Sequence, residues 1–512
     1  MKTVRLNLLL PALLVLPFSA RAQTFMRAYG MPGATFNPPQ SFLSSFGAGM
    51  AADGYLFTEV AGRVCFTDAE GAVQECKQIE AASAVGLLQL RQVETAMNGN
   101  GYFFLANKTD TMIALRTDAA LNIIWQRATV FEGIQLDEQV MPLPDGGCVL
   151  GHSRAQGLNQ RPVLSRFGPD GSTLWQRTYR NSAALTGNLT FDALARTADN
   201  GLLAVGRYNP STPPRPVLVR LNADGTVLWA KEIAPANNGN AFALAAVELP
   251  NGQLRVAVAD AATSARLAIV TLSASGDLLS AWGYEGLLGT PHGLRFLPDG
   301  TLLGVVVNQG QGFRISSDGN LVFATNHGGL PGSVMLATQL LPTNDGGHLF
   351  HGNCTVGFFT DMTPVLYKTG SLGALPPAYG TSFSLTQSAY APTLTNGTIT
   401  DSLVSNVHTP DLAFVPTATL NDTLLAVPTG IASAAQPASM QLWPNPVTDA
   451  LLIDGAFSTG SITITDAMGR VVRKLGPAQL PLSIDTSWLL SGGYAITIAT
   501  PHGPITKQFI KP

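Results

Sequence analysis

Leu164-Ser-Arg-Phe-Gly-Pro-Asp170-Gly171-Ser-Thr-Leu-Trp175 contains the pattern on which the fold of this chain depends. An apolar strand leads into an Asp-Gly turn, and a second apolar strand ends on an aromatic ring. Asp-Gly between apolar runs is a strong hairpin signal, because glycine adopts the positive φ that tight turns require. Clear copies occupy 218–229 and 313–323, and weaker ones turn near residues 70, 120, 275 and 369.

A second hairpin signal alternates with the first. It is an Asx-Gly or Gly-Gly pair followed by a short apolar strand, and its second glycine occurs at positions 54, 101, 147, 201, 252, 300 and 347. Two hairpins in about 50 residues make one four-stranded antiparallel sheet, and sheets repeated around an axis form a β-propeller. The sequence therefore predicts an all-β protein with a seven-bladed β-propeller over residues 23–375.

The composition fits this prediction. Charged residues make up 12% of the 512 residues, about half the usual ~25%, and the 52 glycines and 34 prolines favour turns over long helices. A net charge of −3 provides no basic field for nucleic acid, so no nucleic-acid partner is expected.

Four tryptophans, Trp125, Trp175, Trp229 and Trp282, recur at intervals close to the repeat. We predict that their rings pack between neighbouring blades; the alternative is a ladder of rings that stack on sugars. The Asp-Gly-x-x-Leu-Trp copies also resemble the Trp-docking repeats of quinoprotein dehydrogenases. Because no adjacent cysteine pair is present, no cofactor is expected.

The ring needs a strand to close it. Residues 24–30 read like the fourth strand of a blade, yet they precede the first hairpin. We expect them to pair with the last blade near residues 365–368. The alternative is that residues 370–375 fill this place.

The N-terminus reads as a secretory signal peptide over residues 1–22. Lys2 and Arg5 precede an apolar run at 8–18, and Ala20-Arg21-Ala22 is a small-x-small cleavage site, so the mature chain would begin at Gln23. A membrane anchor is the alternative, but this run is shorter than the roughly 20 residues that span a bilayer. No transmembrane segment is expected.

The last seventy residues form a separate pattern. Trp443-Pro444-Asn445-Pro446 opens it, and the prolines fix an extended backbone because they cannot donate to a sheet. Alternation in 461–465 and 494–498 indicates half-buried strands. Further marks are Gly469, Gly493, Tyr494, Lys507 and Lys511.

Residues 440–512 resemble, in this order of features, the C-terminal sorting domain (Por-type, type A) of the Bacteroidota type IX secretion system. The resemblance implies a small β-sandwich, recognition by the type IX machinery, and a protein that is secreted or attached to the outer cell surface. The nine residues just named would carry the sorting signal. The alternative is an immunoglobulin-like domain that stabilises its neighbour.

Residues 376–439 differ from both parts, because they are rich in Thr, Ser, Ala and Pro and poor in Lys and Arg. They predict either a strand-bearing spacer packed on the propeller or an extended linker. Strands are favoured before residue 428 and a flexible link over 429–439.

Two pairs of cysteines differ in their expected roles. A turn at Glu70-Gly71 places Cys65 opposite Cys76, which predicts a cross-strand disulfide in an oxidising compartment. This register could make them a hydrogen-bonded pair, whose wider Cα separation is less favourable. Cys148 and Cys354 belong to blades three and seven and are predicted to be small buried residues.

A candidate binding face follows from the strand order. The Asx-Gly turns share one rim of the propeller, so the longer connections, where function usually resides, share the other. Their arginines, tyrosine and histidines could hold an acidic glycan or a protein carboxylate: Arg154, Arg161, Arg180, Tyr208, Arg215, His292 and His327. The alternative is a solvated face without a specific ligand.

No catalytic motif or metal-ligand spacing is evident, so catalytic residues and a metal site are not expected. The favoured hypothesis is a surface-delivered propeller that binds a glycan or a protein. The second is a polysaccharide-degrading hydrolase or lyase that uses acidic residues in the funnel, chosen from Asp137, Glu138, Asp192 and Glu285. The third is a structural or adhesin component of the envelope.

Overall fold

The computed structural model describes residues 25–30, most of 47–426 and most of 441–512, and the regular structure within these residues is β-strand. The chain forms two compact units, residues 1–427 and 428–512. The predicted signal peptide lies outside the described residues.

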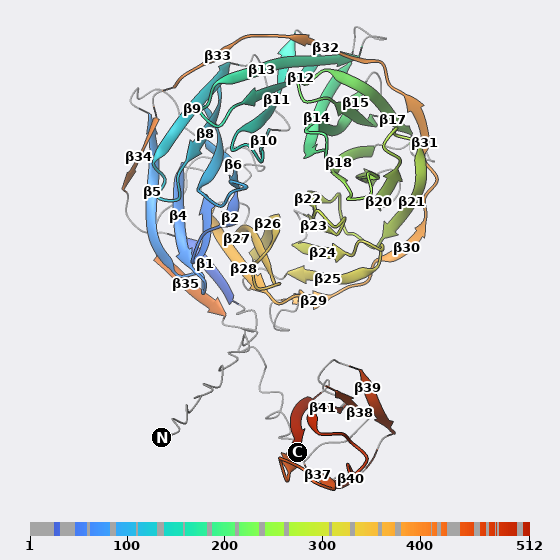
Figure 1. Cartoon of the computed structure of the whole chain (residues 1–512). Coiled ribbons are helices and arrows are strands. Elements are labelled where there is room, and N and C mark those ends of the chain that lie inside the picture. The colour runs from blue at the N-terminus through green and yellow to red at the C-terminus, as the bar shows by residue number, and fades with distance from the viewer. Residues whose placement is uncertain are drawn as a thin grey trace, which may run out of the picture. The chain divides into compact units, whose positions relative to one another are not determined.

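The first unit is a ring of sheets, seven of them in the described part of the chain, and this confirms the predicted all-β propeller (Figure 1). Four strands of each sheet, or blade, follow one another from the centre of the ring outward. Blade 1 contains β2 (Ala48–Met50), β3 (Gly54–Thr58), β4 (Arg63–Asp68) and β5 (Val73–Ala81); blade 2 contains β6 (Gln89–Thr95), β7 (Tyr102–Lys108), β8 (Thr111–Thr117) and β9 (Ile123–Val130).

The next blades repeat this order. Blade 3 contains β10 (Gln139–Pro142), β11 (Cys148–Gln156), β12 (Asn159–Phe167) and β13 (Thr173–Asn181); blade 4 contains β14 (Asn188–Arg196), β15 (Leu202–Asn209), β16 (Arg215–Leu221) and β17 (Val227–Ala234). Blade 5 contains β18 (Ala241–Glu248), β19 (Leu254–Asp260), β20 (Arg266–Leu272) and β21 (Leu278–Glu285); blade 6 contains β22 (His292–Phe296), β23 (Leu302–Val306), β24 (Gln311–Ile315) and β25 (Leu321–His327).

Blade 7 closes the ring with the N-terminal strand. It contains β26 (Ser333–Pro342), β27 (His348–Val356) and β28 (Asp361–Thr369), and β1 (Phe25–Gly30) takes the fourth place. Phe25 lies opposite Lys368 and Ala28 opposite Val365, which confirms the predicted pairing. The two ends of the propeller are therefore joined by backbone hydrogen bonds.

A strand-bearing spacer packed on the propeller was one of the two alternatives for residues 376–439, and its described strands add a fifth strand to the outside of every blade. Residues 380–426, which we call the belt, run around the ring and add one strand to each blade in turn (Figure 1). These strands pair with blades 6, 5, 4, 3, 2, 1 and 7: β29 (Gly380–Ser382), β30 (Thr386–Ala389), β31 (Thr393–Asn396), β32 (Ile399–Leu403), β33 (Val407–His408), β34 (Leu412–Pro416) and β35 (Asn421–Ala426). The belt covers the edge that each fourth strand would otherwise expose.

The belt also contributes to the core. Tyr390, Ile399 and Leu412 are buried, and each belongs to a different hydrophobic cluster of the blades. Asp401 binds two blades at once, because its carboxylate accepts hydrogen bonds from the Arg177 side chain at 2.5 Å and from the backbone N–H of Val227 at 3.1 Å. The belt therefore holds neighbouring blades together as well as covering them.

The hairpin turns are longer than the two-residue turns suggested by Asx-Gly. In blade 3, the Gly171 N–H donates to the Gly168 carbonyl at 2.9 Å, the Gly168 N–H donates to the Ser172 carbonyl at 2.8 Å, and Gly171 has a φ of 77°. A register shift between Arg166 and Phe167 follows the turn. Glycine is favoured at this place because the left-handed backbone is strained for other residues, although Leu121 takes it in blade 2 with a φ of 64°.

Three of the four repeated tryptophans pack between blades as predicted. The rings of Trp125, Trp175 and Trp229 each lie against a turn glycine of the next blade, where an added Cβ would come within 3.1 Å of the ring. The prediction for Trp282 is wrong, because its ring is 48% exposed. In blade 5, the position equivalent to Trp175 is Ser280 and not Trp282. Ser280 lies opposite Thr271 as Trp175 lies opposite Arg166.

Buried tyrosines add a second contact between blades. They follow the ring position by four residues, and each donates its hydroxyl to a glycine carbonyl in the next blade. The pairs are Tyr29 with Gly71 at 2.7 Å, Tyr179 with Gly225 at 2.8 Å, and Tyr284 with Gly319 at 2.8 Å. This bond satisfies the only polar group of a ring that is otherwise packed in apolar surroundings.

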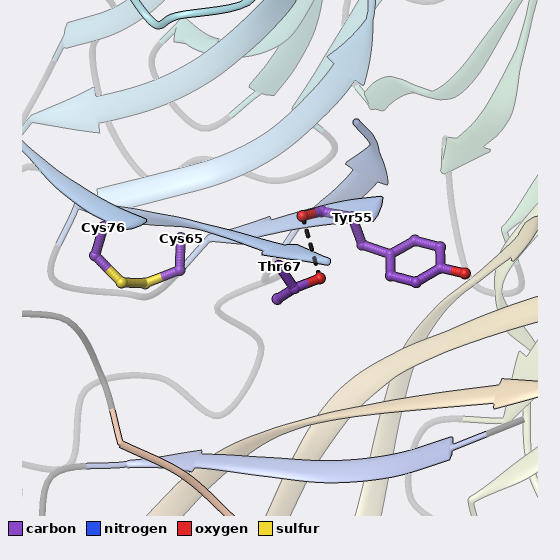
Figure 2. The surroundings of a disulfide bond; sticks show 4 residues. All are labelled: Tyr55, Cys65, Thr67 and Cys76. Atoms are coloured by element: carbon purple, nitrogen blue, oxygen red, sulfur yellow. Dashed lines mark hydrogen bonds between the residues drawn. A yellow bond between two sulfur atoms is a disulfide. The ribbon is translucent and has the colours of Figure 1, made fainter. Parts of the chain in front are cut away.

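Cys65 and Cys76 lie directly opposite each other in β4 and β5 and form a disulfide (Figure 2). Their Cα atoms are 4.1 Å apart, close to the ~4.5 Å of a non-hydrogen-bonded pair. The hydrogen-bonded register considered from the sequence is therefore wrong, because a shift between Phe66 and Thr67 changes the pairing beyond the turn. Cys148 is free and buried, and the Cys354 side chain lies outside the described residues.

The second unit is a small sandwich of two sheets. One contains β36 (Gln441–Trp443), β37 (Ala450–Asp454) and β40 (Leu482–Asp485); the other contains β38 (Ile462–Asp466), β39 (Val471–Leu475), β41 (Gly492–Ile498) and β42 (Ile505–Lys511). Its core is built from apolar residues that alternate along the strands, such as Ile462, Ile464, Ile496 and Ile498.

Candidate functional site

The two rims of the propeller differ in what they carry. Turns such as 143–147 and 168–172 connect the first two and the last two strands of a blade, so they lie on one rim, the turn rim. The connections between second and third strands, and between blades, lie on the opposite rim, the loop rim. The sequence placed the binding face on the loop rim.

The structure brings only part of the predicted binding face to the surface. Tyr208 is buried at 5% exposure in the core of blades 3 and 4, and burial raises the pKa of its hydroxyl. His327 is buried at 3% exposure, with its ring centroid 3.9 Å from that of Phe350. Neither side chain belongs to an exposed face. The His292 side chain lies outside the described residues.

His327 has a structural explanation that the sequence analysis missed. It follows Phe323 by four residues, so it takes the place held by Tyr29, Tyr179 and Tyr284 in other blades. A comparison of the repeats would have indicated a core position. Burial lowers the pKa of His327 to about 3, and burial also lowers the pKa of His152 to about 4.

These buried histidines should make the protein sensitive to acid. Both stay neutral in the folded chain, whereas in the unfolded chain they gain a proton below a pKa of about 6.5. Stability is therefore complete above pH 6.5 and falls by about 1.4 kcal/mol per pH unit for each histidine until the folded pKa is reached. Urea denaturation at pH 7 and pH 4.5 should show a smaller loss for His327→Phe than for the wild type. His408→Phe, at an exposed position, should leave the loss unchanged; an unchanged loss in His327→Phe would contradict the assignment.

The arginines of the predicted face are spread over two adjacent blades. Arg154 lies opposite Arg161 in blade 3, and Arg180 lies on the outer strand of the same blade opposite Thr400. Arg215, in blade 4, is half exposed and contacts Glu232 at 3.5 Å. Like charges directly opposite each other are unfavourable, so the Arg154 and Arg161 pair is the notable feature of this rim.

Of the acidic residues considered for catalysis, Glu138 and Asp192 lie at the inner strands of adjacent blades, whereas Glu285 lies at an outer strand. Glu138 precedes the inner strand of blade 3 and forms an ion pair with Arg91 at 3.5 Å. Asp192 lies at a bulge in the inner strand of blade 4 and accepts a hydrogen bond from Thr190 at 3.0 Å. Glu285 ends the fourth strand of blade 5, beside the belt. Asp137 lies outside the described residues.

A cavity of about 510 Å³ lies on the turn rim between blades 3 and 4. Its apolar wall includes Leu143, Val149, Trp175 and Leu202. Its polar groups include Asp145, Arg166, Arg196 and Asn200. This volume is within the ~300–1,000 Å³ range of small-molecule sites.

The preceding blade interface shows this place filled by aromatic rings. Trp125 lies between Phe103 and Phe167, with ring centroids 5.9 and 5.8 Å apart, and is only 5% exposed. Phe103 comes from the same blade as Trp125, and Phe167 comes from the next blade. The indole is covered on both sides.

Smaller residues replace both phenylalanines around Trp175. Val149 takes the place of Phe103, because the two residues lie opposite Arg166 and Arg116 in equivalent strands. Leu221 takes the place of Phe167, because the two residues lie opposite Val227 and Thr173. The lost ring volume leaves Trp175 only half-buried and lining the cavity. The positions of the repeated turns do not reveal this site, because it depends on the size of the core residues around each tryptophan.

Two of the polar groups are structural. Arg166 forms an ion pair with Asp145, and the same pairing recurs as Arg220 with Asp199 and as Lys368 with Asp345. Burial alone would raise the pKa of Asp199, but hydrogen bonds from Thr197 and Gly201 and the charge of Arg220 lower this pKa below its ordinary value. These pairs fix the turns of their blades.

Arg196 is different, because it is exposed at the end of β14. It forms no ion pair within the residues that the structure describes. It therefore brings a positive charge to the cavity that a protein carboxylate does not neutralise.

The second unit carries the predicted sorting residues. The Asn445 side chain forms two hydrogen bonds with the backbone of the last strand: it accepts from the Ile510 N–H at 2.9 Å and donates to the Gln508 carbonyl at 3.3 Å. Tyr494 stacks on Phe509, with ring centroids 5.6 Å apart. Trp443 is 41% exposed, Lys507 and Lys511 lie on β42, and Gly469 lies outside the described residues.

The profile of the family "Secretion system C-terminal sorting domain" matches residues 441–512. Residues 441–512 are a sorting domain. The protein is therefore a substrate of the type IX secretion system, which delivers it to the cell surface or the extracellular space. The sorting domain determines where the propeller acts and leaves open what the propeller binds.

Solved structures show only low similarity to this chain. A streptogramin B lyase is 13% identical over 68% of this chain and 100% of its own, with a TM-score of 0.41. The Dos1 propeller is 12% identical over 62% and 75%, with a TM-score of 0.38. A Bacteroides caccae protein of unknown function is 16% identical over 39% and 67%, with a TM-score of 0.27. No curated protein matches the sequence. Similarity this low carries no argument, so the propeller rests on its own strand order.

Two further observations concern metal ions and membrane-spanning helices. No group of three or more His, Cys, Asp or Glu side chains suited to a metal ion occurs in the described ranges of the chain. Within the same ranges, no helix has the length and apolar character needed to cross a bilayer.

Proposed function

We propose that this protein is a surface-delivered carbohydrate-binding propeller that holds a saccharide in the cavity between blades 3 and 4. The observation that carries the proposal is the half-buried Trp175 in a cavity where the equivalent Trp125 is fully covered. The C–H face of a sugar ring is apolar and packs well on a flat indole. Hydroxyl groups of the sugar would meet the polar side of the cavity, including Asp145 and Asn200.

The rigidity of the site supports the proposal. The indole nitrogen of Trp175 donates to the Ala223 carbonyl at 3.0 Å, so its ring is held before a ligand arrives. The turn of blade 4 is also fixed, because the Gly201 N–H and the Thr197 hydroxyl both donate to Asp199, at 3.0 and 2.7 Å. A preformed site loses little conformational entropy on binding.

Filling the cavity tests this function. Val149→Phe restores the residue type of blade 2 and should cover Trp175, so glycan affinity should fall at least tenfold, or about 1.4 kcal/mol. The measurement is a glycan array with the full mature chain, followed by calorimetry on the glycans that bind. Trp175→Leu removes the stacking ring and should also weaken glycan binding at least tenfold. Trp229→Leu is its matched control, because it removes the same ring from the next blade and should leave binding intact. Unchanged glycan binding by Val149→Phe would refute the proposal.

The loop rim remains a second proposal. Arg154 and Arg161 lie directly opposite each other, and an acidic glycan or a protein carboxylate would bind them through paired hydrogen bonds from the guanidinium groups. Arg154→Gln with Arg161→Gln should then reduce binding while Val149→Phe does not.

The enzymatic and structural alternatives are separated by the same experiment. Release of reducing ends or unsaturated sugars from a bound polysaccharide would favour the degradative enzyme, with Glu138 and Asp192 as the first residues to test. Binding without release favours the binding protein. If the protein shows neither binding nor release, an adhesin or structural component is favoured.

A further inference from the structure

The cavity between blades 3 and 4 combines a flat indole with one unneutralised cation. We infer that it selects saccharides that carry a carboxylate, that is, uronic-acid residues, and that Arg196 is the residue that determines this selectivity. The inference rests on the proposed saccharide site and names its ligand class.

The charges around the cavity support an anionic ligand. Asp145 and Arg166 neutralise each other through their ion pair, which leaves Arg196 as the net charge among the lining residues. Outside the lining residues, Asp199 and Glu248 share one cation, because Arg220 lies 2.8 Å from Asp199 and 3.3 Å from Glu248, and Glu248 also accepts from the Ala198 N–H at 2.9 Å. A ligand carboxylate would therefore meet one available guanidinium.

The position of Arg196 is particular to blade 4. The first turn of blade 4 begins at Thr197, whose N–H donates to the Gly201 carbonyl. Arg196 is the residue directly before it. The corresponding residues in the other six blades are not cationic: Met50, Thr95, Pro142, Glu248, Phe296 and Pro342. Both phenylalanines are replaced at the interface of blades 3 and 4 and also at that of blades 4 and 5, where Leu203 and Leu272 take their registers, but only the former interface carries a cation at this position.

Geometry favours a carboxylated sugar over a simple anion. A guanidinium binds a carboxylate through two parallel hydrogen bonds, which fixes the plane of the carboxylate. Trp175 lines the cavity from blade 3, and Arg196 lines it from blade 4. A ring with a carboxylate substituent can contact both, whereas a small anion cannot use the indole.

The test compares ligands that differ only in the carboxylate. Oligosaccharides of galacturonate, glucuronate and mannuronate are measured by calorimetry against their carboxyl-reduced counterparts, with the full mature chain. At least one acidic oligosaccharide should bind ten times or more tightly than its reduced form, and the difference should shrink as salt is raised. Arg196→Gln should remove the preference while keeping the affinity for the reduced form, and Arg196→Lys should restore part of it.

The outcomes separate the inference from the function on which it rests. Equal binding of acidic and reduced forms, with loss of both in Val149→Phe, would overturn the acidic selectivity and leave the saccharide site standing. Binding of neither form would overturn both. A preference that survives Arg196→Gln but is lost in the Arg154→Gln, Arg161→Gln variant would assign acidic ligands to the loop rim instead, and would overturn the inference.

Discussion

Replacing the three buried belt residues Tyr390, Ile399 and Leu412 with alanine should nearly abolish the stability of the propeller. Each removes a large side chain from a separate hydrophobic cluster, and such changes cost about 2–5 kcal/mol each. The effects should be close to additive because the residues belong to different blades. Their sum approaches the ~5–15 kcal/mol that usually stabilises a folded domain.

Urea denaturation and hydrogen exchange measure this effect. The amides of the fourth strands, β5, β9, β13, β17 and β21, should lose protection first, because the belt covers their outer edges. Leu403→Ala is the matched control, since Leu403 lies in the belt but is 68% exposed. If the triple variant unfolds at the same urea concentration as Leu403→Ala, the belt does not hold the blades.

Removing the rings of the closing strand should have the second largest effect. Phe25 and Tyr29 are 2% and 0% exposed, and β1 pairs on one side with β28 and on the other with β35. Phe25→Ala with Tyr29→Ala should lower the free energy of unfolding by about 6–10 kcal/mol, since each lost aromatic ring costs about 3–5 kcal/mol. The measurement is again urea denaturation, with exchange at β28 and β35 as a local probe.

A milder variant serves as the control for closure. Tyr29→Phe keeps the ring and removes only the hydrogen bond to the Gly71 carbonyl, which should cost about 1 kcal/mol. A double alanine variant no less stable than Tyr29→Phe would show that the ring does not depend on its N-terminal strand.

The sequence predicted the elements that local chemistry encodes. Asp170-Gly171 and its equivalents marked the turns, and the likeness of residues 24–30 to a fourth strand was enough to pair them with residues 365–368. The belt was only one of two alternatives. Its strands are short and mostly exposed on one side, so their hydrophobic alternation is weak, and they are stabilised by edges supplied from distant parts of the chain.

The candidate site was less predictable. Arg196 and Trp175 are 21 residues apart in sequence and meet only because neighbouring blades pack together. Loop length directed attention to the opposite rim, and polarity wrongly placed Tyr208 and His327 on the surface. The size of the residues that cover each repeated tryptophan is a signal that was present in the sequence, at Val149 and Leu221, and requires the repeats to be aligned strand by strand.

The path of the belt has a geometric consequence for a protein displayed at a cell. Its last strand, β35, pairs with β1 of blade 7. In a circle of seven, the junction of blades 3 and 4 is diametrically opposite blade 7 (Figure 1). The cavity therefore lies on the side of the ring farthest from the end of the belt, so a saccharide held there would not meet the last belt strand.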